Sequence, residues 1–289
     1  MTTPREELAH IARQVRAWAE WSRECGGDGL VSEAPTAELL DQLSAGAPAP
    51  VGRPRKQARP IAPVGERVAA PPAPPPAPPL TAVRGADERS ARALAPGDRK
   101  RRLQVLTEEV SQCTRCVLHE DRTQTVFARG NPDADLMFVG EGPGFEEDRQ
   151  GYPFVGPAGQ LLDKMIAAMG YHRDDVYIAN IVKCRPPKNR KPTEDETASC
   201  AAYLREQIEL VSPKVMVALG ATGVQGLLGT RMGITRMRGT WKTYRGRIPL
   251  MPTFHPAYLL RSPEKKRDVW NDLQEVMRKL GKEPPSKKS

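Results

Sequence analysis

Four cysteines are the residues whose spacing most clearly predicts chemistry in this sequence. Cys113 and Cys116 form a Cys-x2-Cys pair, and Cys184 and Cys200 follow further along the chain. Four thiolates can hold a zinc ion or an iron–sulfur cluster, and their number does not decide between the two. The second pair is spaced too widely for a zinc ribbon. Cys25 stands apart as an ordinary thiol, and an odd total argues against a disulfide framework.

The segments that follow the predicted strands carry the other candidate residues. Gly140-Glu141-Gly142-Pro143-Gly144 lacks both the Lys-Ser/Thr of a P-loop and the GxGxxG spacing, so alone it predicts only a tight turn. Asn180 lies near the end of the next predicted strand, 176–182. Its amide either satisfies backbone groups or pairs with the donor and acceptor of a planar heterocycle.

An aromatic residue and a histidine complete this set. Phe154 lies in Tyr152-Pro153-Phe154-Val155-Gly156, where it is either a core side chain or a loop ring that stacks on a base. His255 follows the last predicted strand and precedes Pro256, which fixes the neighbouring backbone. It is either a structural cap or a stabiliser of a developing anion at the start of the next helix.

Strands that alternate with helices must position these side chains. Apolar runs predict strands at 136–140, 176–182, 215–220 and 248–254. Helices are predicted at 157–169, at 193–211 with a Thr193–Glu196 capping box, after residue 220, and from Pro263 with Ser262 as its cap. This order predicts a parallel sheet covered on both faces, with the site beyond the carboxyl ends of the strands.

The chain divides into unlike parts. Residues 1–46 hold 4 basic and 8 acidic residues and predict a short acidic helical unit. Residues 47–97 hold 13 of the 29 prolines and 8 basic against 3 acidic residues, which predicts a disordered Pro/Ala/Arg-rich linker. Residues 98–282 have the size of one globular domain, and 283–289 form a basic tail.

Several classes of protein are excluded by what the sequence lacks. No apolar run approaches the roughly 18 residues that a membrane span needs. The N-terminus has no apolar signal core, so we expect a cytoplasmic protein rather than a secreted one. The net charge of +9 favours an acidic partner.

Together these motifs closely resemble the family-four uracil-DNA glycosylases, bacterial and archaeal repair enzymes that carry a [4Fe-4S] cluster. The resemblance covers roughly residues 103–281 and leaves out the N-terminal unit and the linker. It rests on 140–144, 151–156, 180–190, 255–261 and the four cysteines.

The resemblance implies an α/β/α sandwich around a four-stranded, mainly parallel sheet. It also implies a structural [4Fe-4S] cluster held by Cys113, Cys116, Cys184 and Cys200, and so iron rather than zinc. The implied activity flips uracil out of DNA and hydrolyses its N-glycosidic bond, which leaves an abasic site for base excision repair. We expect the protein to be bacterial and associated with the nucleoid through DNA.

Roles for individual residues follow from the resemblance. Phe154 would stack on uracil, Asn180 would read its N3–H and O4 edge, and His255 with backbone N–H groups near Gly142 would stabilise the uracil anion. Glu141 is our choice for positioning water or offsetting the charge on the sugar. Glu147 is the second choice and could instead line the pocket beside uracil C5.

The sequence departs from some relatives in two places. The better-known uracil glycosylases have an aspartate where this chain has Gly142, so water activation cannot be transferred from them. Some relatives crosslink to the abasic product through a histidine in the loop after the second strand. Residues 187–192 contain no histidine, and we therefore expect an enzyme that turns over.

The DNA-contacting residues are expected in the loops that surround the site. Arginines would attract phosphates, and an apolar side chain would wedge into the gap left by the flipped base. The main candidates are Arg185, Arg190, Tyr258, Leu259 and Arg261, and Lys191 and Leu260 are further ones. At least one of Leu259 and Leu260 is expected to pack under the loop instead. Glu146 and Asp148 are interpreted as solvated.

Two other functions remain open from the sequence. An iron–sulfur nuclease or polymerase-associated factor would need a carboxylate cluster for metal, and residues 146–148 are the local candidate. A non-catalytic DNA-binding module could use the same pocket only to recognise damage. We expect a monomer whose N-terminal unit could bind a protein partner.

Overall fold

The apolar runs of the sequence form the centre of a six-stranded sheet. The computed structural model describes residue 16 and residues 95–284. The four predicted strands are β2 (Leu136–Gly140), β3 (Tyr177–Asn180), β4 (Val215–Leu219) and β6 (Ile248–Thr253). They lie side by side in the order β3-β2-β4-β6, and each neighbouring pair is parallel. The expected parallel sheet is confirmed.

Two short edge strands make the sheet mixed and were not predicted. β1 (Arg129–Gly130) pairs antiparallel with β3, and β5 (Lys242–Tyr244) pairs antiparallel with β6. The expectation of four strands therefore needs correction to six. Strands of two and three residues are too short to show the alternation on which a sequence-based prediction depends.

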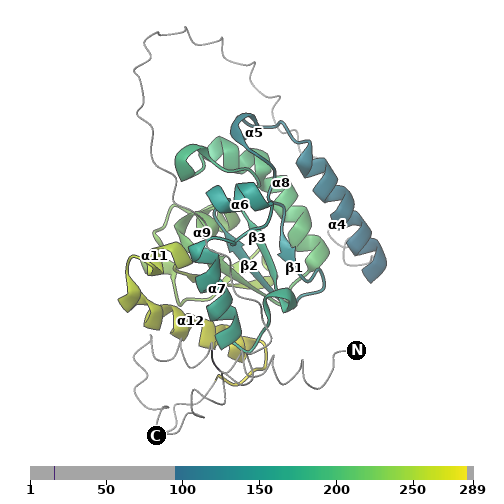
Figure 1. Ribbon diagram of the computed structural model, residues 1–289. Helices are drawn as coiled ribbons and strands as arrows, with labels where there is room; N and C mark the ends of the chain where they lie inside the picture. Colours follow the sequence, from purple (N-terminus) through teal and green to yellow (C-terminus); the bar gives the residue numbers. More distant parts are fainter. Residues whose placement is uncertain (1–15, 17–94, 285–289) are drawn as a thin grey trace, which may run out of the picture. The chain divides into compact units, whose positions relative to one another are not determined.

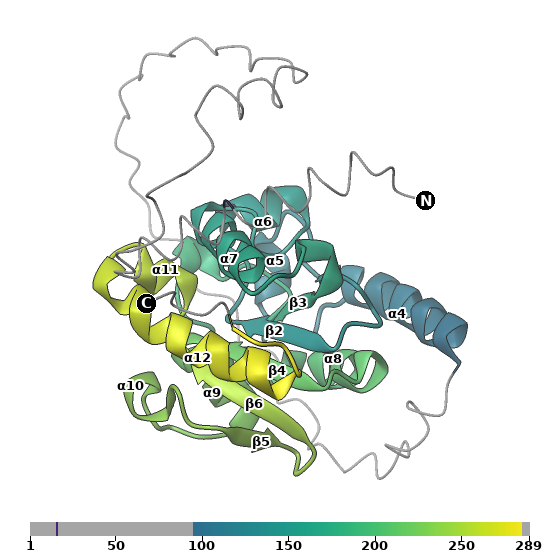
Figure 2. The ribbon, with the colours of Figure 1, turned by 90° about the horizontal axis from the view of Figure 1, so that it is seen from below.

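Helices cover both faces of the sheet, as expected (Figures 1 and 2). One core lies between the sheet and the helices α4 (Pro96–Ser111), α8 (Glu194–Val211) and α9 (Gly220–Leu228). The opposite core lies against α7 (Pro157–Ala168), α11 (Pro256–Leu259) and α12 (Lys266–Lys279). Along β2, Met137 and Val139 face the first core, while Leu136 and Phe138 face the second.

Helix boundaries agree with the sequence where caps are strong. Thr193 Oγ1 accepts the backbone N–H of Glu196, and the Glu196 carboxylate accepts that of Thr193, so the predicted capping box is present. Ser262 makes no side-chain cap, and a short 3-10 turn, Pro263–Lys265, precedes α12. The helix expected directly after His255 is α11. The helices not predicted are α4, α5 (Leu118–Asp121), α6 (Phe145–Gln150) and α10 (Ile234–Met237).

The predicted domain boundaries are only partly covered by this structure. Helix α4 begins at Pro96, two residues before the predicted start of the folded domain at 98. The N-terminal unit apart from residue 16, nearly all of the linker and residues 285–289 lie outside the described residues. Among the helices that the structure describes, none has the length and apolar character to cross a membrane.

Candidate active site and cysteine centre

A cleft of about 600 Å³ lies where the carboxyl ends of the parallel strands meet. Its volume is within the range of roughly 300–1,000 Å³ that is usual for small-molecule sites. Segments far apart in the sequence line it: the loop after β2, the end of β3 and the loop after β6. The candidate residues brought together here are Glu141, Gly142, Glu147, Phe154, Asn180, Arg190, His255, Tyr258 and Arg261.

Asn180 presents an unsatisfied acceptor to this cleft. Its residue is only 2% exposed, and within the described chain its Oδ1 atom has no hydrogen-bond partner. A Cβ atom on Gly140 would lie 2.6 Å from Asn180 Oδ1 and 2.6 Å from Phe154 Cζ. Glycine at 140 therefore lets the amide and the ring approach the same point. A buried acceptor without a donor costs about 1–3 kcal/mol, which a bound donor would recover.

Phe154 is held in a backbone conformation that phenylalanine rarely adopts. Its φ angle is +56°, in the left-handed region. Arg173 Nη2 donates to the carbonyl oxygens of Pro153 (2.7 Å) and Phe154 (2.6 Å), and Arg173 Nη1 pairs with the Asp163 carboxylate at 2.5 Å. These contacts fix the strained loop and so the position of the ring in the cleft.

His255 faces Phe154 across the cleft. The two rings are stacked, with 5.6 Å between centroids and 28° between planes. His255 caps α11, because its Nδ1 accepts the backbone N–H of Ala257 at 3.1 Å. Burial, together with the charge of Arg261, lowers the pKa of His255 to about 4. The imidazole is therefore neutral at pH 7, and the cap leaves its proton on Nε2 as a donor.

Glu141 and Gly142 lie in the loop after β2. Glu141 lines the cleft, and its carboxylate has no ion pair or hydrogen bond to another described side chain. A Cβ on Gly142 would lie 2.7 Å from Val182 Cγ2. A side chain at 142 would thus force Val182 to move, which gives a physical reason for glycine where better-known uracil glycosylases carry aspartate.

Glu147 joins the two loops that wall the cleft. Its carboxylate accepts the backbone N–H groups of Gly144 (3.1 Å), Val155 (3.0 Å) and Gly156 (3.1 Å). The neighbouring Asp148 was expected to be solvated, which is wrong: it is buried and accepts the N–H of Thr123. The acidic run 146–148 is therefore largely committed to fixing backbone.

The arginines around the cleft differ in whether their guanidinium groups are already bonded to other side chains. Arg261 is exposed and lines the cleft. Arg190 lines it too, but its guanidinium is paired with both carboxylate oxygens of Glu196, at 2.8 and 2.5 Å. Arg185 does not line the cleft; it lies beside it, and its Nε donates to Asn189 Oδ1 at 2.7 Å.

One predicted DNA contact needs correction. Leu259 is 0% exposed and packs in the core beneath α11, so in this structure it cannot reach DNA. Leu260 is 48% exposed and is the leucine that this loop presents to solvent. Tyr258 lines the cleft, and its ring lies 5.0 Å from that of Phe254.

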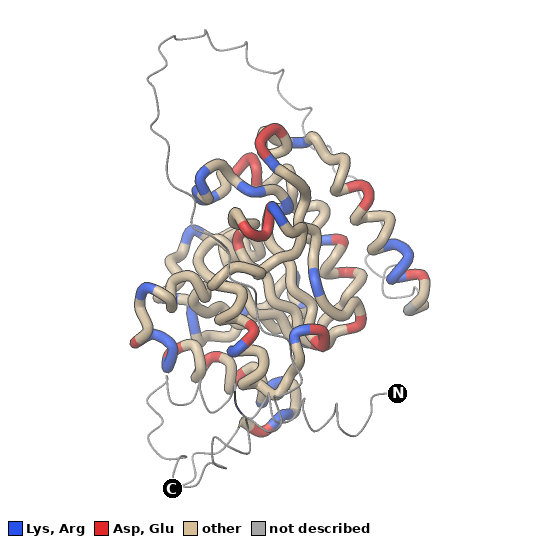
Figure 3. Tube along the Cα trace, viewed as in Figure 1, with Lys and Arg blue, Asp and Glu red and all other residues tan. Residues whose placement is uncertain are grey.

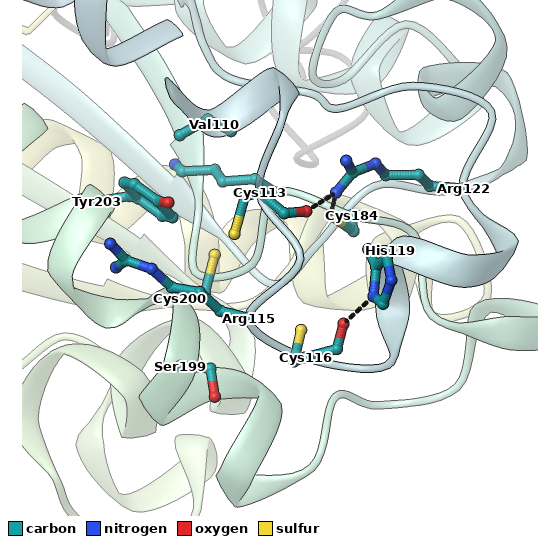
Figure 4. A pocket seen from close by; sticks show the side chains of 11 residues that line it. Val110, Cys113, Arg115, Cys116, His119, Arg122, Cys184, Ser199, Cys200 and Tyr203 are labelled. Carbon is teal, nitrogen blue, oxygen red and sulfur yellow. Dashed lines mark hydrogen bonds between the residues drawn. The ribbon is translucent and has the colours of Figure 1, made fainter. Parts of the chain in front are cut away.

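The four cysteines of the sequence analysis gather around one cavity, which is distinct from the cleft (Figure 4). Cys113 and Cys116 come from the segment between α4 and α5, Cys184 from the loop after β3, and Cys200 from α8. All four are free cysteines. The cavity thus ties together three segments that are distant in the sequence.

Four thiols line this one cavity, and thiolates are ligands that suit zinc or an iron–sulfur cluster. In the described part of the chain, no three metal-binding side chains are already gathered closely enough to hold a single ion. Arg122 Nη1 donates to Cys184 Sγ at 3.2 Å and to the Cys113 carbonyl at 2.7 Å, as partners of metal-bound thiolates commonly do.

Burial works against free thiolates here. It raises the pKa of Cys116 and Cys184, and it raises the pKa of Cys200 to about 11 against the opposing charge of Lys183. A metal group that binds these sulfurs would hold them deprotonated.

Lys183 is a site residue that sequence reasoning missed. It is 1% exposed, lines the cysteine cavity, and donates from Nζ to the backbone oxygen of Asn180 at 2.9 Å. Burial lowers the pKa of Lys183 to about 8. The one signal in the sequence was that Lys183 directly precedes Cys184. A lysine is rarely buried unless it is paired with a negative group, and a thiolate is such a group.

Comparison with known proteins agrees with this arrangement. The profile of the Uracil DNA glycosylase superfamily matches residues 127–274. A type-4 uracil-DNA glycosylase from Thermotoga maritima is 46% identical over 188 residues, which cover 64% of this chain and 98% of that protein. A type-4 enzyme from Archaeoglobus fulgidus is 37% identical, with 64% and 96% covered. A type-5 enzyme from Pyrobaculum aerophilum is 39% identical, but over only 34% of this chain and 50% of its own length. This chain belongs to the uracil-DNA glycosylase superfamily and, within it, to the type-4 family.

Proposed function

We propose that this protein removes uracil from DNA by hydrolysing its N-glycosidic bond, which releases free uracil and leaves an abasic site for base excision repair. The observation that carries the proposal is the buried, unpartnered Oδ1 of Asn180 beside the Phe154 ring. Uracil offers an N3–H donor to that acceptor and an O4 acceptor to the amide N–H. Cytosine reverses both groups, so it would leave the Asn180 amide mispaired or force it to flip.

The uracil nucleotide must leave the base stack to reach this cleft. Extrusion costs a few kcal/mol, and stacking on Phe154 offsets part of that cost. Phosphate attraction must come from individual cations, since basic and acidic residues are interspersed along the described chain (Figure 3). Arg261 and Arg185 are best placed, because Arg190 is already paired with Glu196. This attraction should weaken as salt rises.

Bond cleavage leaves negative charge on uracil and positive charge on the sugar. Neutral His255 donates from Nε2 to the departing base, together with backbone N–H groups near Gly142. One preorganised donor of this kind contributes roughly 3–4 kcal/mol by analogy with oxyanion holes. Glu141 lines the same cleft, and it positions the attacking water or offsets the charge on the sugar.

The cysteine cavity fits a structural [4Fe-4S] cluster held by Cys113, Cys116, Cys184 and Cys200. Such a cluster would supply a cross-link between the segment after α4, the loop after β3 and α8. The support is the single cavity that the four sulfurs share, with Arg122 and Lys183 beside it.

The roles of the remaining parts are also proposals. We infer that the folded domain acts as a monomer in the bacterial cytoplasm and reaches the nucleoid through DNA. The N-terminal unit and linker would tether it to a protein partner.

One assay tests the activity against its competitors. Iron-loaded protein is incubated with a uracil-containing oligonucleotide, single- or double-stranded, in EDTA and without nucleotide. We expect free uracil and abasic sites. Strand cleavage that requires magnesium would indicate a nuclease, and binding without release of base would indicate a recognition module.

A further inference from the structure

An exposed aromatic ring stands at the rim of the cleft. Phe145 is the first residue of α6, lines the cleft, and is 50% exposed. It belongs to neither core cluster of the described residues. A half-exposed phenylalanine buries little apolar surface, so core packing does not explain why a ring is present at this position.

Two arginines lie against the Phe145 ring. The guanidinium carbon of Arg185 is 5.0 Å from the ring centroid, and that of Arg149 is 5.9 Å away. Arg185 is fixed by its bond to Asn189 Oδ1. Apart from the ring, the guanidinium of Arg149 has among the described residues a 3.9 Å surface ion pair with Glu146. The ring therefore has one anchored cation and one cation that can move aside.

This combination matches the chemistry of an unpaired nucleotide. A nucleobase stacks on an aromatic ring or on a guanidinium plane, and its phosphate pairs with arginine. When uracil is drawn into the cleft, the adjacent base loses a stacking neighbour. A ring at the rim of the same cleft is placed to replace it.

We propose that Phe145, with Arg185, forms a stacking site for the nucleobase next to the extruded uracil in single-stranded DNA. This inference rests on the proposed function and adds a preference for unpaired strands. In a duplex the adjacent base remains paired with the other strand and stacked on its remaining neighbour. Phe145 therefore contributes less to the binding of duplex DNA than to the binding of single-stranded DNA.

Two matched substitutions test the proposal. F145L keeps an apolar side chain but removes the ring, and F145Y keeps the ring. We expect F145L to raise KM for a single-stranded uracil oligonucleotide about tenfold, or ~1.4 kcal/mol, with kcat unchanged and a smaller effect on duplex. F145Y should restore the wild-type KM. M232A, which alters another exposed apolar side chain outside the cleft, should change nothing.

A spectroscopic readout follows the stacking directly. The oligonucleotide carries uracil joined to its sugar through carbon, so that it is not excised, and 2-aminopurine on its 5′ side or its 3′ side. Wild-type protein should quench the emission of one of the two probes, and F145L should not.

The outcomes separate this inference from the proposed function. Failure of the wild-type protein to release uracil would overturn the function. Normal release with equal KM for wild type and F145L, or quenching that F145L retains, would overturn the stacking site alone.

Discussion

Lys183 Nζ donates a 2.9 Å hydrogen bond to the backbone oxygen of Asn180, and this bond joins the two centres of the protein. Lys183 lines the cysteine cavity, while Asn180 lines the cleft. The end of β3 and the turn after it thus carry, within five residues, the amide proposed to read the base, a buried cation and a proposed cluster ligand. The cysteine centre can fix the cleft without taking part in its chemistry.

Replacing Lys183 should therefore weaken the fold as well as uracil binding. K183M leaves the buried oxygen of Asn180 without its charged donor, a loss of about 2 kcal/mol. We expect the apparent Tm of the iron-loaded protein to fall by about 4–8 °C and KM for uracil-DNA to rise. K214M removes an exposed lysine paired with Asp135 and is the control. Equal Tm values for the two variants would show that the buried bond contributes nothing.

Loss of one cysteine ligand should release the metal group. C184S should give colourless and poorly soluble protein, because three thiolates cannot complete the proposed cluster. C25S should remain brown and stable. Visible absorption and iron content measure the difference, and a brown, stable C184S protein would refute the ligand assignment.

The sequence predicted the centre of the molecule better than its edges. The apolar runs that became β2, β3, β4 and β6 are long enough to be predicted as strands. Glu141, Asn180 and His255 were chosen as candidate site residues because they lie at or just after the ends of such strands. Helix α4 could have been found, since Leu103, Leu106 and Val110 keep helical spacing after Pro96.

Other features could not be read from residue types. Leu259 and Leu260 are adjacent and identical, and only packing decides that the first is buried and the second exposed. The roles of Arg173 and Lys183 depend on carbonyl groups to which they bond across the fold. Pattern and propensity carry no information about such partners.

His255 should account for a large part of the rate. H255A removes the neutral donor to the departing base, and we expect kcat to fall about 10²–10³-fold. Single-turnover excision of uracil measures this step apart from product release. A variant that kept more than about a tenth of the rate would exclude a donor role worth 3–4 kcal/mol.

The same histidine should make stability depend on pH. Its pKa is about 4 in the folded protein against 6.5 ordinarily, so between these values the unfolded chain binds more protons. The contribution of neutral His255 to stability is therefore complete above about pH 6.5 and is lost as pH falls toward 4. H255Q should flatten the Tm profile in this window. Identical profiles for H255Q and wild type would contradict the assignment.

The most direct test of the central claim compares uracil with cytosine at one position of one oligonucleotide, in wild-type and N180D proteins. If Asn180 reads the base in a preformed cleft, the wild-type protein should release uracil and leave cytosine intact. This role also predicts that N180D loses at least about tenfold in uracil excision, since a carboxylate cannot donate to O4, and gains activity on cytosine. Full uracil activity in N180D, with none on cytosine, would contradict the claim.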